Sequence, residues 1–191
     1  MLFIVLLYGD VMEFELFKTK YKIDFSFFVI LSLALLFDSK AILYLLLFSA
    51  LHEFAHIILL YSLGGRADRI CISYYGIGMK YSSAVSFKNE IIILSAGIIL
   101  NLFFALINVQ RQINFALFVI NVLPIYPLDG GRIIKLVAER IFDYNLSYKI
   151  CFIISILFFI LITIYGIYKK NFNILLICVY LLTWIVRGTY D

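Results

Sequence analysis

Residues 41–63 form an apolar segment that is long enough to cross a bilayer as a helix, which needs about 20 residues. Other apolar segments lie at residues 23–37, 91–109, 115 onward, 150–168 and 172–186. Hydrophobic residues make up 64 % of the sequence, and the mean hydropathy is +1.05. This content is well above the roughly 50 % of soluble domains. The sequence therefore predicts an all-α polytopic membrane protein with about six transmembrane helices.

The apolar segment at residues 41–63 contains the motif His52-Glu53-Phe54-Ala55-His56. Residues four apart in a helix lie on the same face, so both imidazoles face the same way. Imidazole nitrogens suit Zn²⁺, and an adjacent glutamate can take a proton from water activated by the metal. The alternative is two histidines packed in an apolar helix, but the chain has only two histidines and both fall in this motif. We expect one zinc ion per chain, bound by His52 and His56, with Glu53 as general base.

A broken helix follows the fourth apolar segment, because both prolines of the chain, Pro124 and Pro127, lie there. Such backbone exists at membrane depth only where protein buries it or where it lines a wet cavity. Asp129 comes directly after the prolines, whereas most other acidic residues lie in the tail, at span ends or in loops. An Asp before Gly-Gly also fits an ordinary turn. Because a catalytic zinc site commonly has three protein ligands, we predict Asp129 as the third.

Shorter patterns predict local structure around these segments. Residues 18–23 alternate between lysine and other side chains, as in a strand at the membrane surface. Residues 69–86 alternate in part and fit either a small hairpin dipping toward the site or an interfacial loop. Ala96, Gly97 and Asn101 form a small-residue patch suited to close helix contact, although a lipid-facing glycine of no consequence is also possible.

The expected organisation is a membrane domain at residues 23–187 with a catalytic core at about 41–132. An N-terminal segment at residues 1–22 is expected to contain the surface strand, and residues 188–191 form a short tail. Small membrane-associated β-strands are expected near the core. With six spans, most basic residues fall on the side of both termini, which predicts cytoplasmic termini. The net charge of +4 fits anionic lipid, and no basic block with interleaved aromatic residues suggests nucleic-acid binding.

Taken together, three motifs resemble those of the site-2 protease family of intramembrane zinc metalloproteases, peptidase family M50. They are His52-Glu53-x-x-His56, Ala96-Gly97-x-x-x-Asn101, and Asn121 with Pro124, Pro127 and Asp129-Gly130-Gly131. The resemblance implies a three-helix catalytic core, zinc binding by His52, His56 and Asp129, and catalysis by Glu53. It also implies that Asn121 positions the substrate or stabilises the intermediate. Ile98 stands where the family usually has proline.

The six-span layout is most similar to the sporulation factor IVFB branch of this family. That resemblance implies a sporulation sigma-factor proform as the membrane-tethered substrate, inhibitory membrane proteins as partners, and a bacterial cell or forespore membrane as the location. Neither a PDZ domain nor the CBS domain frequent in that branch is expected. Alternatives are a general site-2 protease acting on an anti-sigma factor or signal-peptide remnant, a zinc peptidase that trims lipid-anchored tails, and a non-catalytic membrane scaffold.

Overall fold

The computed structural model of the chain describes residues 6–8, 11–16, 19–73, 76–81, 85–171, 174, 178–179 and 181–182. The chain forms two compact units, Met1–Phe118 and Val119–Asp191.

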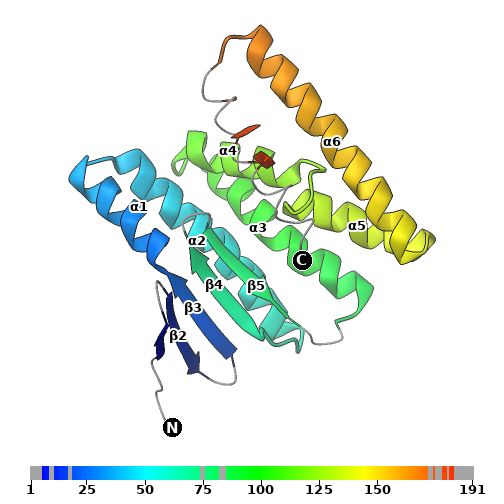
Figure 1. The fold of residues 1–191 in the computed structure, drawn as a ribbon, viewed down its shortest axis with the longest axis horizontal. Helices are drawn as coiled ribbons and strands as arrows, with labels where there is room; N and C mark the ends of the chain where they lie inside the picture. Colours follow the sequence, from blue (N-terminus) through cyan, green and yellow to red (C-terminus); the bar gives the residue numbers. More distant parts are fainter. Residues whose placement is uncertain are drawn as a thin grey trace. The chain divides into compact units, whose positions relative to one another are not determined.

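The first unit contains a five-stranded sheet in the order β1-β2-β3-β4-β5 (Figure 1). The strands are β1 (Leu6–Tyr8), β2 (Val11–Leu16), β3 (Thr19–Asp24), β4 (Arg69–Ser73) and β5 (Gly76–Lys80). Neighbouring strands are antiparallel except β3 and β4, which run parallel with Tyr21 opposite Ile70. A parallel pair needs a crossover connection, and here two helices, α1 and α2, supply it.

Two of the strand predictions can be compared with this sheet. The alternating segment at residues 18–23 is found as β3, within the described residues 19–24. The segment at residues 69–86 contains the antiparallel hairpin β4–β5, in which Ser73 pairs with Gly76. The hairpin interpretation is therefore confirmed. The proportion of sheet is larger than the sequence suggested, because β1 and β2 extend it on the N-terminal side.

Among the described residues of the first unit, four helices begin: α1 (Phe25–Leu36), α2 (Lys40–Ser62), α3 (Phe87–Leu106) and α4 (Arg111–Val122), the last of which continues into the second unit. The Asp24 carboxylate caps α1 by accepting a hydrogen bond from the Ser26 amide at 2.9 Å. The chain leaves α2 at Gly64, whose φ of 80° suits glycine.

A small core joins α2, the sheet and α3. Its buried residues are Leu60, Ala67, Ile70 and Ile93. The Thr19 hydroxyl, also buried, donates to the Ala67 carbonyl at 2.8 Å and so ties β3 to the segment that precedes β4. This packing fixes α2 against α3, the helix pair on which the two histidines depend.

The second unit contains α5 (Asp129–Ile141) and α6 (Tyr144–Tyr168), preceded by the proline-containing loop at residues 123–128. An ordinary turn at Asp129-Gly130-Gly131 was the alternative to a ligand role for Asp129, and in the structure these residues form the first turn of α5. Ile125 in the loop is fully buried. The Tyr126 amide donates to the Ser155 hydroxyl of α6 at 2.9 Å, and the Tyr126–Pro127 peptide bond is cis. The loop thus has a defined conformation held by α6.

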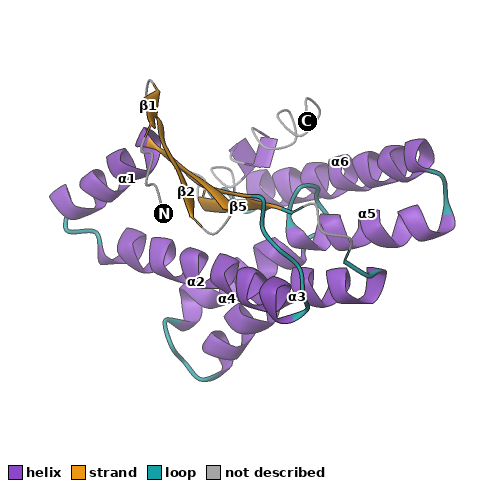
Figure 2. Cartoon of the chain, turned by 90° about the horizontal axis from the view of Figure 1, so that it is seen from below, coloured by secondary structure: helices purple, strands orange, loops and turns teal. Residues whose placement is uncertain are grey.

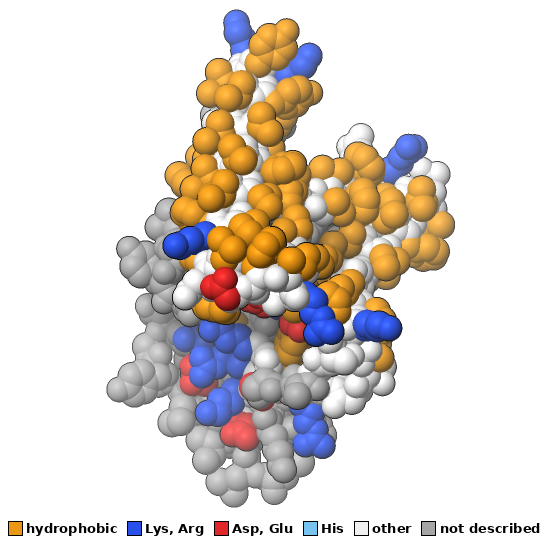
Figure 3. Space-filling model, turned by 90° about the vertical axis from the view of Figure 1, so that its right-hand side faces the viewer, with side chains coloured by type: hydrophobic (Ala, Val, Ile, Leu, Met, Phe, Trp, Pro, Cys, Tyr) orange, Lys and Arg blue, Asp and Glu red, His pale blue; other side chains and the backbone are white. Residues whose placement is uncertain are grey.

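Among the described residues, three helices are long and apolar enough to cross a membrane, namely α2, α3 and α6. Helices dominate the chain, with the sheet as a minor element (Figure 2). Hydrophobic side chains cover the helices on the face in Figure 3, as a lipid-facing surface requires. The expectation of a mostly helical chain with apolar helices of membrane-spanning length is therefore confirmed.

The number of six spans stays a prediction. Two of the expected spans coincide with α1 and α4, which have 12 residues each, fewer than a spanning helix needs. The expected sixth span at residues 172–186 lies mostly outside the described residues.

Candidate metal centre

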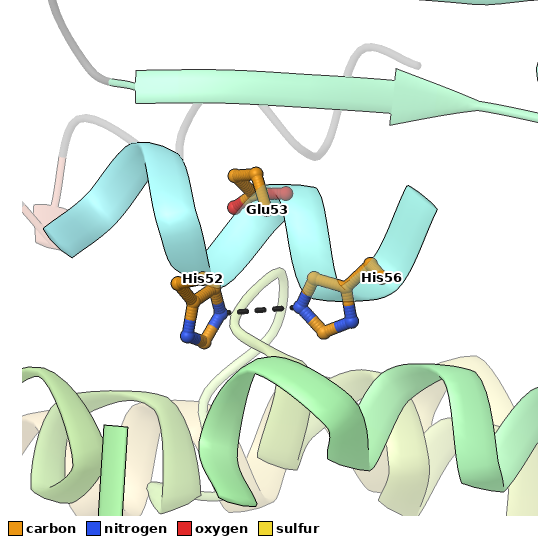
Figure 4. Close-up of side chains that lie close together, drawn as sticks. All are labelled: His52, Glu53 and His56. Carbon is orange, nitrogen blue, oxygen red and sulfur yellow. Dashed lines mark hydrogen bonds between the residues drawn. The ribbon is translucent and has the colours of Figure 1, made fainter. Parts of the chain in front are cut away.

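His52 and His56 lie one turn apart near the middle of α2, and both are almost completely buried, with exposed fractions of 3 % and 4 %. Their Nε2 atoms are 3.1 Å apart. Figure 4 shows the two rings next to each other on the same side of the helix. Two nitrogens that each lie about 2.0–2.1 Å from one zinc ion must be closer than about 4.2 Å, so this spacing fits a shared ion.

Glu53 belongs to the same cluster. One ligand atom from each of His52, Glu53 and His56 can be chosen so that all lie within 4.8 Å of one another. The Glu53 side chain is half-buried, whereas the two imidazoles are almost completely buried. The sequence predicted this arrangement, because it depends only on helical spacing within α2.

The orientation of the His56 ring is fixed by the backbone of α3. Its Nδ1 atom lies 2.6 Å from the Ile93 carbonyl oxygen. Because a carbonyl can only accept, the Nδ1 atom carries the hydrogen and Nε2 is left with a lone pair. A histidine ligand usually has this second hydrogen bond, which sets the tautomer and aims the other nitrogen at the metal. The hydrogen bond at Nδ1 therefore leaves Nε2 of His56 as the nitrogen suited to binding a metal ion.

The His52 ring is held by two other residues of α3. The Asn101 amide nitrogen lies 2.9 Å from His52 Nδ1, and Asn101 is fully buried. Gly97 lies against the ring itself: a Cβ atom there would be 2.5 Å from Cε1 and 2.6 Å from Nδ1. The small-residue patch is thus a close helix contact, and the lipid-facing interpretation of Gly97 is wrong.

Asn121 and Asp129 belong to the second stretch that the sequence singled out. Asn121 is the second-last residue of α4, and Asp129 is the first residue of α5, where it is 7 % exposed. Both have interactions in the structure. Asp129 as a zinc ligand and Asn121 as a substrate-positioning residue stay predictions.

The two glycines after Asp129 explain the local shape of this stretch. A Cβ atom on Gly130 would collide with the Val122 and Leu123 carbonyl oxygens, and one on Gly131 with the backbone of Ile125 and Tyr126. The first turn of α5 therefore lies directly on the backbone of the preceding loop. Together with Ser155, which the sequence analysis did not identify, these glycines determine where the Asp129 backbone lies in its own unit.

The model of peptidase family M50 matches residues 105–165, a range that contains Asn121 and Asp129 but not the histidine motif. Among solved structures, the site-2 protease from Methanocaldococcus jannaschii superposes with a TM-score of 0.69 at 18 % identity, covering 93 % of this chain and 94 % of that chain. This chain has the fold of a site-2 protease. A search of curated protein sequences gives no match.

The site-2 protease fold extends over almost the whole chain, so it includes both the histidine motif and the stretch around Asp129. The resemblance noted in the sequence is therefore supported at the level of fold and of the M50 match. Assignment to the sporulation factor IVFB branch stays a prediction.

Proposed function

We propose that this chain is an intramembrane zinc metalloprotease that cleaves a membrane-tethered protein within or near the bilayer. The observation that carries the proposal is the pair of buried imidazoles 3.1 Å apart with Glu53 beside them, in a helix long and apolar enough to span a membrane. An ionisable group at such a position is expensive and suggests function. The M50 match and the site-2 protease fold support the same reaction class.

His52, His56 and Asp129 would hold the zinc ion. When bound, zinc would act as a Lewis acid that polarises a peptide carbonyl, and it would lower the pKa of water enough to provide a hydroxide nucleophile near neutral pH. The Ile93 carbonyl contributes by holding the His56 ring in the tautomer with its hydrogen on Nδ1 and its lone pair on Nε2. The near-complete burial of both rings excludes bulk water from the side of the histidines that faces α3.

Glu53 would act as the general base and then as the general acid. Its carboxylate takes a proton from the attacking water and returns it to the nitrogen of the departing amine. The position of Glu53 fits both steps, since it lies next to the imidazoles and is only half-buried. Asn121 would hold the substrate carbonyl through its side-chain amide.

A helical substrate has to unwind before cleavage, because its peptide groups are hydrogen-bonded within the helix. In the described sheet, β5 is an edge strand, since it pairs only with β4. An extended substrate segment could pair with this edge by strand addition. β5 also contacts α2, the helix with the zinc motif. Shortening side chains of the hairpin should therefore slow cleavage while zinc stays bound.

As the substrate we propose a sporulation sigma factor in its membrane-tethered proform, with inhibitory membrane proteins as partners and both termini in the cytoplasm. This assignment rests on the similarity to the sporulation factor IVFB branch. The competing substrates are an anti-sigma factor and a signal-peptide remnant, and the competing function is a non-catalytic scaffold.

The test compares wild type with Glu53→Gln, using purified protein in detergent and each of the three substrate classes. Zinc content is measured in parallel. Glu90→Gln is the matched control, because Glu90 lies in the first turn of α3 and bonds to Tyr81. We expect stoichiometric zinc in all three proteins, cleavage by wild type and Glu90→Gln, and a loss of about 100-fold or more in Glu53→Gln.

Other outcomes separate the parts of the proposal. If only the anti-sigma factor or the signal-peptide remnant is cleaved, the protease stands and the sigma-factor assignment fails. If zinc binds but none of the three substrates is cleaved, the result favours a non-catalytic scaffold over the proposed protease. If wild type binds no zinc, the metal centre itself is wrong.

A further inference from the structure

Three residues of α3, spaced four apart, support the histidines of α2. Ile93 offers its carbonyl to His56, Gly97 makes room for the His52 ring, and Asn101 bonds to His52 Nδ1. All three are buried. The spacing places them on one stripe of α3, facing α2. Of the three, Asn101 is the one whose side chain can either donate or accept a hydrogen bond.

In the structure, the hydrogen bonds form a chain with one consistent direction. The Asn101 amide N–H donates to His52 Nδ1 at 2.9 Å. His52 Nδ1 therefore has no hydrogen, and in the neutral ring the hydrogen is on Nε2. That N–H donates to His56 Nε2 at 3.1 Å, and His56 Nδ1 donates to the Ile93 carbonyl at 2.6 Å. His52 Nε2 thus carries a hydrogen, and the lone pair of His56 Nε2 accepts it, so in this arrangement neither Nε2 atom offers a lone pair to a cation.

Binding a metal requires a different arrangement at His52 but not at His56. His56 already has its hydrogen on Nδ1. His52 must move its hydrogen from Nε2 to Nδ1, which leaves the ring neutral and frees the Nε2 lone pair. Asn101 must then accept instead of donate. Rotating its amide by about 180° exchanges the nitrogen and oxygen ends, which have nearly the same shape.

The Asn101 oxygen is available for this role. It is buried and, among the described residues, has no hydrogen-bond partner. A buried polar atom without a partner is unusual and calls for an explanation. Rotating the amide only exchanges which end lacks a partner, so it loses no hydrogen bond.

We propose that Asn101 is a positioning residue whose amide turns over when metal binds, so that its oxygen accepts from His52 Nδ1 and holds His52 in the ligating tautomer. This inference rests on the proposed zinc function. It assigns to Asn101 the outer-shell role that the Ile93 carbonyl has for His56.

The first experiment measures the zinc Kd by chelator competition for wild type, Asn101→Leu and Asn101→Asp. Leucine has a similar size but forms no hydrogen bond, so we expect Kd to rise about 10- to 100-fold, as for other outer-shell changes. Aspartate can only accept, so Asn101→Asp should bind zinc at least as tightly as wild type. If both variants weaken binding equally, Asn101 does not act as an acceptor and the inference fails.

Asn114→Leu is the matched control. Asn114 is also fully buried, it also has an oxygen without a partner among the described residues, and its amide nitrogen donates to the Val109 carbonyl. Because the Asn114 side chain bonds to a backbone carbonyl and not to a histidine, Asn114→Leu should lower the stability of the protein without changing the zinc Kd. An equal rise in Kd for Asn101→Leu and Asn114→Leu would overturn the inference.

A second measurement needs no variant. Because the chain has only two histidines, ¹⁵N-histidine labelling reports on these two rings alone. We expect the His52 hydrogen on Nε2 in metal-free wild type and on Nδ1 after zinc is added, with His56 keeping its hydrogen on Nδ1. A hydrogen that is absent from His52 Nδ1 in the zinc-bound protein would refute the switch. Absence of zinc binding by wild type would instead refute the proposed function.

Discussion

Adding one methyl group at Gly97 should disrupt the metal centre from the side of α3. A Cβ atom there would lie 2.5–2.6 Å from three atoms of the His52 ring. Non-bonded carbon atoms prefer about 3.5–4.0 Å, so ring and helix would have to separate by about 1 Å. His56 and Asn101 bond to the ring at its two nitrogens. The ring therefore cannot move without losing a hydrogen bond.

Two effects of Gly97→Ala follow from this geometry. Overpacking of a buried contact costs about 1–3 kcal/mol, so the metal-free protein should unfold at a lower temperature. Metal–ligand distances tolerate changes of about 0.2 Å, far less than the required displacement. We therefore expect the zinc affinity to fall by about 100-fold or more, at or beyond the upper end for outer-shell changes.

The assay combines thermal unfolding of the metal-free protein in detergent with the zinc Kd from chelator competition. Gly78→Ala, in β5, is the matched control, because a Cβ atom at that position would meet nothing within 4 Å. This control should retain the wild-type zinc Kd. If Gly97→Ala and Gly78→Ala have the same stability and the same Kd, the close contact between α3 and His52 is refuted.

Three further predictions concern other parts of the chain. Gly131→Ala should lower the free energy of unfolding by about 1–3 kcal/mol, measured by thermal unfolding, because its methyl group would press on the Tyr126 backbone. Ser155→Ala should cost about 1–3 kcal/mol in the same assay, because the Tyr126 amide loses its acceptor. Burial, followed by the neighbouring Tyr61, raises the pKa of Tyr21. A group whose pKa is raised in the folded state contributes stability below its unfolded pKa, which is about 10 for tyrosine. This stability is lost as the pH rises through the folded-state pKa. Tyr21→Phe should therefore remove part of the loss of stability at alkaline pH, measured by unfolding curves at several pH values.

The part of the site that lies within one helix could be predicted from the sequence. His52, Glu53 and His56 come together because the helical repeat places residues four apart on one face, and nothing distant is needed. The same holds for the end of α2 at Gly64.

The contacts that orient the histidines could not be predicted. Ile93 acts through its backbone carbonyl, which no side-chain pattern reveals. Asn101 and Gly97 were recognised as a small-residue patch, but helical spacing does not tell which helix faces them. The parallel pairing of β3 with β4 is similarly non-local, since two helices separate the strands. In the sequence, Gly130-Gly131 also fits a turn, whereas in the structure the two glycines lie in the first turn of α5 and permit close backbone contact.

The shortness of α1 has a consequence for how deep the sheet lies in the bilayer. α1 is about 18 Å long, and roughly the same length of α2 separates Lys40 from His52. Residues of both helices line one apolar cavity together with Ile72 and Ser73 of β4. If α2 spans the membrane, the end of β4 therefore lies near the level of the histidines. Water and an extended peptide backbone would then find hydrogen-bonding groups at a depth where lipid alone offers none.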